Sequence, residues 1–353
     1  MAKPKVYIYT PVDESGDSHR QLEEAGCQLK LGEAYWSNFA AETENISEHL
    51  DHQTTALMSV ANRNKPVTRE VLLAAKNLRI ISKYTIGVDD IDIEAATELG
   101  VLVTHCPTEA NWGGVAESAL AMMLTMLKKL RERDNHVKNA GWRDAKLTGT
   151  YLGRRQDGYP GITVGIVGLG RIGSRLADLL APWRLRVIAH DPHVQLAHFI
   201  HHNVERVDME TLLEEADVIS LHCNLTDETR DLIGAVELGK MKSTAILLNA
   251  ARGPMVVIDD LVDALEKEQI AGAAIDVYPI EPVPAQSPLL GMGDKVLLSP
   301  HCVAFNKDSG LVHGIPWATG AVLSALRGEV PENVYNEEVI EKWLERFGGR
   351  SAL

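Results

Sequence analysis

The chain has 353 residues, 45% of them apolar and 24% charged, which is typical of a globular protein with more than one compact core. A formal net charge of −14, with no run of Lys and Arg, argues against nucleic acid or an anionic membrane as a partner. The four cysteines are widely spaced, which excludes a Cys-x-x-Cys motif and favours a reducing compartment. The first residues turn polar too soon for a signal peptide, and no apolar run approaches the ~20 residues of a membrane span, so we predict a cytoplasmic protein.

The first third of the chain alternates short strand-like and helix-like segments. β-branched and aromatic residues or short apolar runs predict strands, and helical spacing bounded by Gly or polar residues predicts helices. We expect strands at 5–10, 56–60, 78–82 and 101–104, and helices at 68–76 and 93–99. This βαβ rhythm predicts an open parallel sheet.

A long helix is expected next, over residues 111–139. Leu120, Met123, Leu124, Leu127 and Leu130 recur at helical spacing, while the later turns carry many charges. The Gly-rich segment 149–161 is expected to be a loop. The helix is therefore predicted to connect two domains.

The clearest signal is a strand at 162–167 followed by a glycine turn and a helix at 175–180. Gly168, Gly170 and Gly173 fit G-x-G-x-x-G in the strand–turn–helix context that dinucleotide binding requires. The first glycine allows a tight turn, the second lets a pyrophosphate approach the backbone, and the third lets helix and strand pack closely. Further strands are expected at 186–189, 218–221, 245–248, 271–275 and 296–298.

Asp191 stands at the end of the strand that follows the glycine turn. A carboxylate there accepts hydrogen bonds from the adenosine ribose and repels a 2′-phosphate. No Arg follows it in the next three residues, so we predict NAD (NADH) as the cofactor in preference to NADP.

Arg252, Glu281 and His301 each come just after an apolar strand. Ligands of open α/β sheets bind beyond the carboxyl ends of the strands, so these groups could converge. A guanidinium grips a carboxylate and polarises a neighbouring carbonyl, an imidazole moves a proton, and a carboxylate orients that imidazole. This trio suits hydride transfer to a keto acid.

The chain resembles the D-isomer-specific 2-hydroxyacid dehydrogenase family along nearly its whole length. The matching stretches are TIGVDDID at 85–92, VAE at 115–117, GLGRIG at 168–173, NAARG at 249–253, DVYPIEP at 276–282 and SPH at 299–301. The resemblance implies an NAD-dependent oxidoreductase acting on a 2-hydroxy or 2-keto acid, D-specific, with a small-molecule substrate and a homodimeric assembly. The apolar face of 120–130 is one place for the dimer contact, and burial within the subunit is the equal alternative.

The resemblance also implies the role of each site residue. Arg252 binds the substrate carboxylate and carbonyl, His301 is the acid/base, and Glu281 is its partner. Asp276 holds the nicotinamide carboxamide. The other implied contacts are those of Arg171 and Ile172 with the pyrophosphate, of the Cys223 and Ala250 backbone with the cofactor, and of the Ile86 and Gly87 backbone with the substrate carboxylate.

The implied fold is α/β, with two doubly wound parallel-sheet domains (Rossmann-like and flavodoxin-like) and a cleft between them. We expect a discontinuous substrate domain at 1–107 plus 305–353 and an NAD-binding domain at 108–304. Lys83 stands where relatives that bind a phosphorylated substrate carry an Arg, so it could hold a second anionic group, although an exposed Lys is the favoured interpretation.

Two other functions remain open on the sequence. An NAD(H)-sensing, corepressor-like binding protein of the same fold would keep the same three residues, and a phosphite-type dehydrogenase would use a different donor. We expect no metal site, because His198, His201 and His202 lack a completing ligand and are better explained as a solvated histidine patch.

Overall fold

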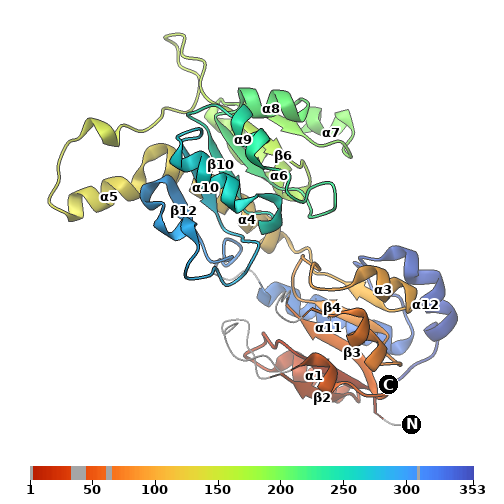
Figure 1. The fold of residues 1–353 in the computed structure, drawn as a ribbon. Helices are drawn as coiled ribbons and strands as arrows, with labels where there is room; N and C mark the ends of the chain where they lie inside the picture. Colours follow the sequence, from red (N-terminus) through yellow and green to blue (C-terminus); the bar gives the residue numbers. More distant parts are fainter. Residues whose placement is uncertain (1–2, 33–44, 61–65, 308–310) are drawn as a thin grey trace. The chain divides into compact units, whose positions relative to one another are not determined.

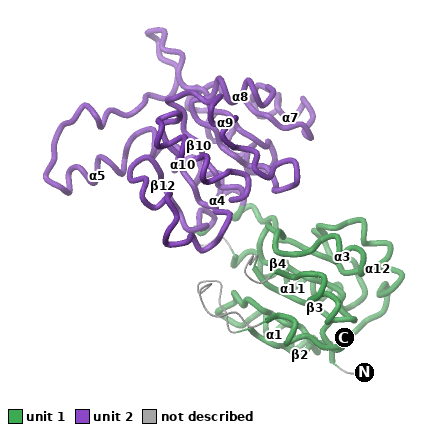
Figure 2. Tube along the Cα trace, viewed as in Figure 1, with its two compact units in different colours: residues 1–111, 305–353 green, residues 112–304 purple. Residues whose placement is uncertain are grey.

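The computed structural model describes residues 3–32, 45–60, 66–307 and 311–353. The chain divides into two compact units, one formed by Met1–Asn111 with Phe305–Leu353 and the other by Trp112–Ala304 (Figure 2). Each unit holds one sheet in which all neighbouring strands are parallel (Figure 1). The fold is therefore α/β, as the sequence predicts.

The first unit has a five-stranded sheet in the order β2-β1-β3-β4-β5. Its strands are β1 (Lys5–Ile8), β2 (Gln28–Leu31), β3 (Thr54–Ser59), β4 (Ile80–Lys83) and β5 (Leu102–Thr104). Its helices are α1 (Asp17–Glu24), α2 (Arg69–Ala74), α3 (Ile93–Glu98), α11 (Leu311–Arg327) and α12 (Ile340–Phe347). Side chains alternate across the sheet, so one face packs on α1, α11 and α12 and the other on α2 and α3.

The second unit has a seven-stranded sheet in the order β12-β11-β10-β9-β6-β7-β8. Its strands are β6 (Thr163–Val167), β7 (Arg186–His190), β8 (Glu205–Arg206), β9 (Val218–Leu221), β10 (Ile246–Asn249), β11 (Gly272–Ile275) and β12 (Val296–Leu298). Its helices are α4 (Glu109–Lys128), α5 (Leu130–Lys138), α6 (Arg171–Leu180), α7 (Leu196–His201), α8 (Met209–Glu215), α9 (Ala235–Lys240) and α10 (Ile258–Glu266).

Both faces of the second sheet are covered, because its strands are apolar on both sides. Leu247 packs with α8, α9 and α10, whereas its neighbours Ile246 and Leu248 pack with α4, α6 and α7. The strand order reverses between β6 and β9, which are neighbours in the sheet although β7 and β8 come between them in the chain. Ligands of doubly wound sheets bind beyond the carboxyl ends of the strands at such a point.

The single long helix predicted over 111–139 is wrong. α4 ends at Lys128, Lys129 adopts a left-handed conformation with a φ of 51°, and α5 follows without one buried residue. The Leu127 carbonyl accepts the N–H of Thr150, 2.8 Å away, so a contact with the following loop ends the helix. The predicted loop at 149–161 is confirmed, and edge strands β2 and β8 were not predicted.

Candidate active site

The glycine turn lies between β6 and α6, and each of its glycines has a separate steric reason. Gly168 has a φ of 89°, and a Cβ added there would lie 2.7 Å from the Cys223 nitrogen. A Cβ on Gly173 would lie 2.1 Å from the Gly168 carbonyl oxygen. A Cβ on Gly170 would meet no described atom within 4 Å. The turn is therefore closed on the protein side and open on the side that Gly170 presents.

This open side suits a phosphate group. Gly170 is also the N-cap of α6, and in the described structure no side chain caps that helix end by hydrogen bonding and no acidic residue lies in its first turn. The first N–H groups and the helix dipole at Arg171 and Ile172 thus favour an anion. The residues present fit the pyrophosphate of a dinucleotide.

Asp191 is tied to the same turn. Its Oδ2 accepts the N–H of Leu169 at 2.8 Å, and its Oδ1 accepts the N–H of His193 at 2.9 Å. The carboxylate at the end of β7 is therefore held beside the glycine turn. Cys223 follows β9 on the other side of Gly168, and burial raises the pKa of its thiol to about 11, so it is a neutral side chain near neutral pH.

Arg252 lies in the turn after β10, with Ala250 preceding it. The side chain of Asn249 shapes this turn, because its Nδ2 donates to the Arg252 carbonyl at 2.9 Å and its Oδ1 accepts the Ala251 N–H at 3.1 Å. A Cβ on Gly253 would lie 1.9 Å from the carbonyl carbon of Tyr278. The Arg252 turn thus packs directly on the loop that carries Glu281.

Glu281 and His301 form a hydrogen-bonded pair. His301 Nδ1 lies 2.9 Å from Glu281 Oε2, and the Tyr278 N–H donates to Glu281 Oε1, also at 2.9 Å. The His301 side chain is 48% exposed and that of Glu281 only 23%. The carboxylate thus orients the imidazole through Nδ1 and leaves Nε2 on the far side of the ring.

Asp276 connects this pair to the end of β11. Its carbonyl accepts the His301 N–H at 2.8 Å and its Oδ1 accepts the Cys302 N–H at 3.0 Å. Asp276 is fully buried, and its Oδ2 has no hydrogen-bond partner among the described residues. An unpaired buried carboxylate oxygen is costly unless a ligand donates to it, so Asp276 fits the amide N–H of a nicotinamide carboxamide.

The structure places the turns of Arg252, Glu281 and His301 beyond the carboxyl ends of β10, β11 and β12, three neighbouring strands. Sequence reasoning missed Asn249 and Tyr278, which hold these turns. Neither carries a spacing signal of its own, because both act through bonds to backbone groups.

Ile86 and Gly87 lie in the first unit, in the turn after β4. Within the part of the chain that the structure describes, their N–H groups enter no hydrogen bond. The Ile86 carbonyl lies 3.1 Å from His105 Nδ1, and the Gly87 carbonyl accepts the Thr85 hydroxyl. The turn is thus held through its carbonyls, which suits two amides that receive an anion.

Lys83 is not exposed, and it is not placed to meet a substrate. It is fully buried, with Nζ 2.6 Å from Asp90 Oδ2 and 2.8 Å from both Ser59 Oγ and the Val60 carbonyl. Burial opposes the charged ammonium, but Asp90 and Tyr9 outweigh it and raise the pKa of Lys83. These contacts use its three protons, so both earlier interpretations of Lys83 are wrong.

The histidines of α7 are also less solvated than predicted. His198 Nε2 lies 2.8 Å from Ser174 Oγ and 3.0 Å from the Leu169 carbonyl, and His202 Nδ1 pairs with Asp178 at 2.8 Å. His201 is exposed. Across the described ranges, no group of three or more His, Cys, Asp or Glu side chains is arranged to hold a metal ion.

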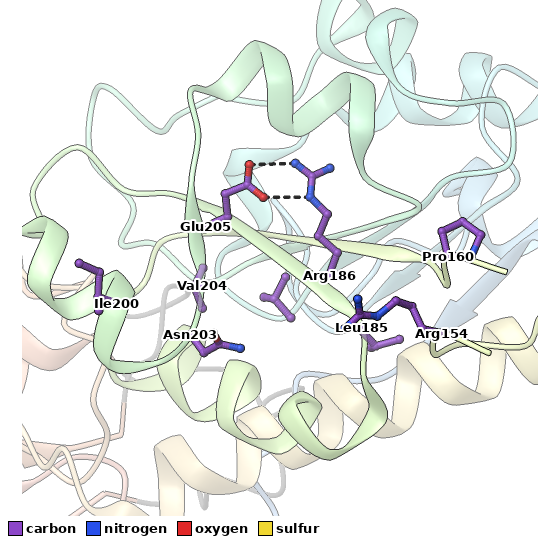
Figure 3. Close-up of a pocket in the computed structure, with 9 residues that line it drawn as sticks. Arg154, Pro160, Leu185, Arg186, Ile200, Asn203, Val204 and Glu205 are labelled. Atoms are coloured by element: carbon purple, nitrogen blue, oxygen red, sulfur yellow. Dashed lines mark hydrogen bonds and ion pairs between the residues drawn. The ribbon is translucent and has the colours of Figure 1, made fainter. Parts of the chain in front are cut away.

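A groove of about 590 Å³ lies elsewhere on the second unit (Figure 3). Its lining includes Arg154, Asn203 and the amino end of β7, where Arg186 turns toward Glu205 and pairs with it at 2.9 Å. The predicted site residues lie at the opposite, carboxyl ends of the strands, so this groove is not part of the site.

Within the described residues, no helix has the length and apolar character needed to cross a membrane.

Comparison with known proteins gives consistent results. A family model described as "D-isomer specific 2-hydroxyacid dehydrogenase, NAD binding domain" matches residues 120–303. A glyoxylate reductase of Thermofilum pendens is 35% identical, covering 97% of both chains, and a D-3-phosphoglycerate dehydrogenase of Archaeoglobus fulgidus is 34% identical, covering 96% of this chain and 60% of its own length. A D-lactate dehydrogenase of Aquifex aeolicus, solved with NAD and lactic acid, superposes with a TM-score of 0.79 at 25% identity, covering 96% of this chain and 98% of its own.

Proposed function

The chain belongs to the D-isomer-specific 2-hydroxyacid dehydrogenase family, and from that premise we propose that it transfers a hydride between NAD(H) and the α carbon of a D-2-hydroxy or 2-keto acid. The observation that carries the proposal is the His301–Glu281 pair, bonded through the backbone to Asp276, whose buried Oδ2 has no described partner. An oriented proton donor and an acceptor for the nicotinamide amide thus stand side by side.

In this proposal each residue has one task. NADH supplies the hydride when it is bound. Arg252 grips the substrate carboxylate and polarises the adjacent carbonyl. His301 Nε2 gives its proton to the carbonyl oxygen and recovers it in the oxidation direction, while Glu281 keeps the ring oriented through Nδ1.

The amides of Ile86 and Gly87 are proposed to receive the substrate carboxylate. Lys83 has no part in this, because its protons are used inside the first unit.

The preference for NAD over NADP rests on Asp191. Its carboxylate stands at the end of β7 beside the glycine turn, where negative charge favours ribose hydroxyls and repels a 2′-phosphate. Initial rates with NADH and NADPH test this preference, and equal rates would contradict it.

We also propose that the protein is a homodimer. Sedimentation at micromolar protein concentration tests this oligomeric state.

The decisive experiment measures NADH oxidation with glyoxylate, pyruvate and larger or phosphorylated 2-keto acids. His301→Ala should lower kcat by about a hundred- to ten-thousandfold, the range of general acid catalysis, while NADH still binds in a fluorescence titration. The exposed His201→Ala on α7 is the matched control and should keep the wild-type rate. An active His301→Ala enzyme, or a wild type inactive with every substrate, would reject the proposal.

A further inference from the structure

We propose that Tyr278 is a positioning residue that holds together the three chain segments bearing Arg252, Glu281 and His301. The inference rests on the proposed function and deepens it. Tyr278 follows β11 by three residues, and its side chain is 5% exposed within the hydrophobic core of the second unit. A ring fixed in a packed core gives its backbone and its hydroxyl defined places.

The backbone of Tyr278 fixes Glu281. Its N–H donates to Glu281 Oε1 at 2.9 Å, while the other carboxylate oxygen, Oε2, lies 2.9 Å from His301 Nδ1. The carboxylate is therefore held at both oxygens. Because a carboxylate that can rotate also lets the imidazole turn, the Tyr278 N–H contributes to the orientation of His301.

The hydroxyl of Tyr278 fixes the segment that leads to His301. The ladder between β11 and β12 ends with the pair Ile275 and Leu298. Beyond it, the Tyr278 hydroxyl lies 3.0 Å from the Ser299 carbonyl and 3.1 Å from the Ile275 carbonyl. Burial, together with the charge of Asp276, raises the pKa of Tyr278 to about 12, so the hydroxyl keeps its proton and donates it at neutral pH.

The third segment packs on the Tyr278 backbone. A Cβ on Gly253 would lie 1.9 Å from the Tyr278 carbonyl carbon, so only glycine allows the Arg252 turn to come this close. A shift of Tyr278 would therefore displace the Arg252 turn as well as the pair. None of these contacts touches the reacting atoms, which makes Tyr278 a positioning residue and not a catalytic one.

The test is Tyr278→Phe, which keeps the ring and the N–H and removes only the hydroxyl. We expect kcat for the best 2-keto acid to fall about five- to tenfold, the effect of one neutral hydrogen bond, with KM for NADH within about twofold of wild type. The pH midpoint of the kcat profile should also move, because His301 is less firmly held. Tyr159→Phe is the matched control, since it removes an exposed Tyr hydroxyl that donates to the Tyr151 carbonyl in the same unit.

A readout that needs no turnover separates this inference from the proposed function. Hydrogen exchange over residues 276–302 should speed up about tenfold in Tyr278→Phe and stay at the wild-type rate in Tyr159→Phe. If the wild type reduces no 2-keto acid, the proposed function fails, while the exchange rates still decide the role of Tyr278. Unchanged exchange, or a kcat and pH profile equal to wild type in an active enzyme, would overturn the inference. If Tyr278→Phe loses both NADH binding and its cooperative fold, the inference is also overturned, because Tyr278 would then have a general structural role.

Discussion

The buried ion pair of Lys83 and Asp90 allows a quantitative prediction. Both side chains have no solvent exposure, and Nζ lies 2.6 Å from Oδ2. Removing one partner of such a pair leaves an uncompensated buried charge, which costs about 3–5 kcal/mol. We therefore expect Lys83→Met and Asp90→Leu each to lower the free energy of unfolding by that amount.

The double variant distinguishes a coupled pair from two independent side chains. It removes both charges, although Ser59 Oγ and the Val60 carbonyl lose a donor. We expect it to be about as stable as either single variant, which corresponds to a coupling free energy of about 3–5 kcal/mol.

Urea unfolding followed by tryptophan fluorescence measures these changes, since Trp343 is fully buried in the same unit. The exposed pair Lys267 and Asp263 is the matched control, because exposed pairs contribute only about 0–1 kcal/mol. Single variants that cost less than about 1 kcal/mol, or a double variant whose loss equals the sum, would refute the reasoning. If Lys83→Met keeps wild-type stability but binds phosphorylated substrates less tightly, then Lys83 contacts the substrate and the interpretation as a purely structural pair is wrong.

Two further predictions concern the second unit. Gly170→Ala should weaken NADH binding by about tenfold or more without changing the melting temperature, whereas Gly173→Ala should lower the melting temperature, because its Cβ would meet the Gly168 carbonyl at 2.1 Å. Equal effects of the two substitutions on binding and melting would contradict this. Burial lowers the pKa of His222 from 6.5 to about 4, so the unfolded chain takes up a proton in that range that the fold excludes, and stability falls by about 3 kcal/mol as the pH drops through it. In urea unfolding, the stability difference between wild type and His222→Asn should therefore shift by about 2–3 kcal/mol toward the variant between about pH 7.5 and pH 4.5, and a constant difference would contradict the assignment.

The positions of the glycine turn and of the strand-end residues could be predicted because they depend on local order in the chain. A strand, a glycine turn and a helix follow one another without interruption, so their contact needs no information from distant segments. Arg252, Glu281 and His301 each follow an apolar strand of a parallel sheet, and such strand ends lie at one edge. The order of the strands in that sheet was not predicted and comes from the structure.

Lys83 could not be placed in this way, because its environment is built from segments far apart in the chain. Ser59 and Val60 come from the end of β3, while Asp90 comes from the turn after β4. A Lys at the end of a strand is most often exposed, and Lys83 can be buried only because these partners compensate its charge and accept its protons. The break at Lys129 has a similar origin, since the acceptor at Leu127 is taken by Thr150 of the following loop.

The conformation of His301 shows how local strain and site chemistry are connected. His301 has a φ of 50°, in the left-handed region that costs a non-glycine residue roughly 1–2 kcal/mol. Two hydrogen bonds to Asp276 offset this cost, because its carbonyl accepts the His301 N–H and its Oδ1 accepts the Cys302 N–H. The remaining oxygen of the same buried carboxylate has no partner among the described residues. The group that we propose to bind the cofactor amide is therefore also the group that holds the backbone of His301, the proposed acid/base residue. Hydride transfer and proton transfer must occur in one geometry, and we propose that Asp276 links the two, because it would contact the cofactor amide and it already holds the backbone at His301 and Cys302.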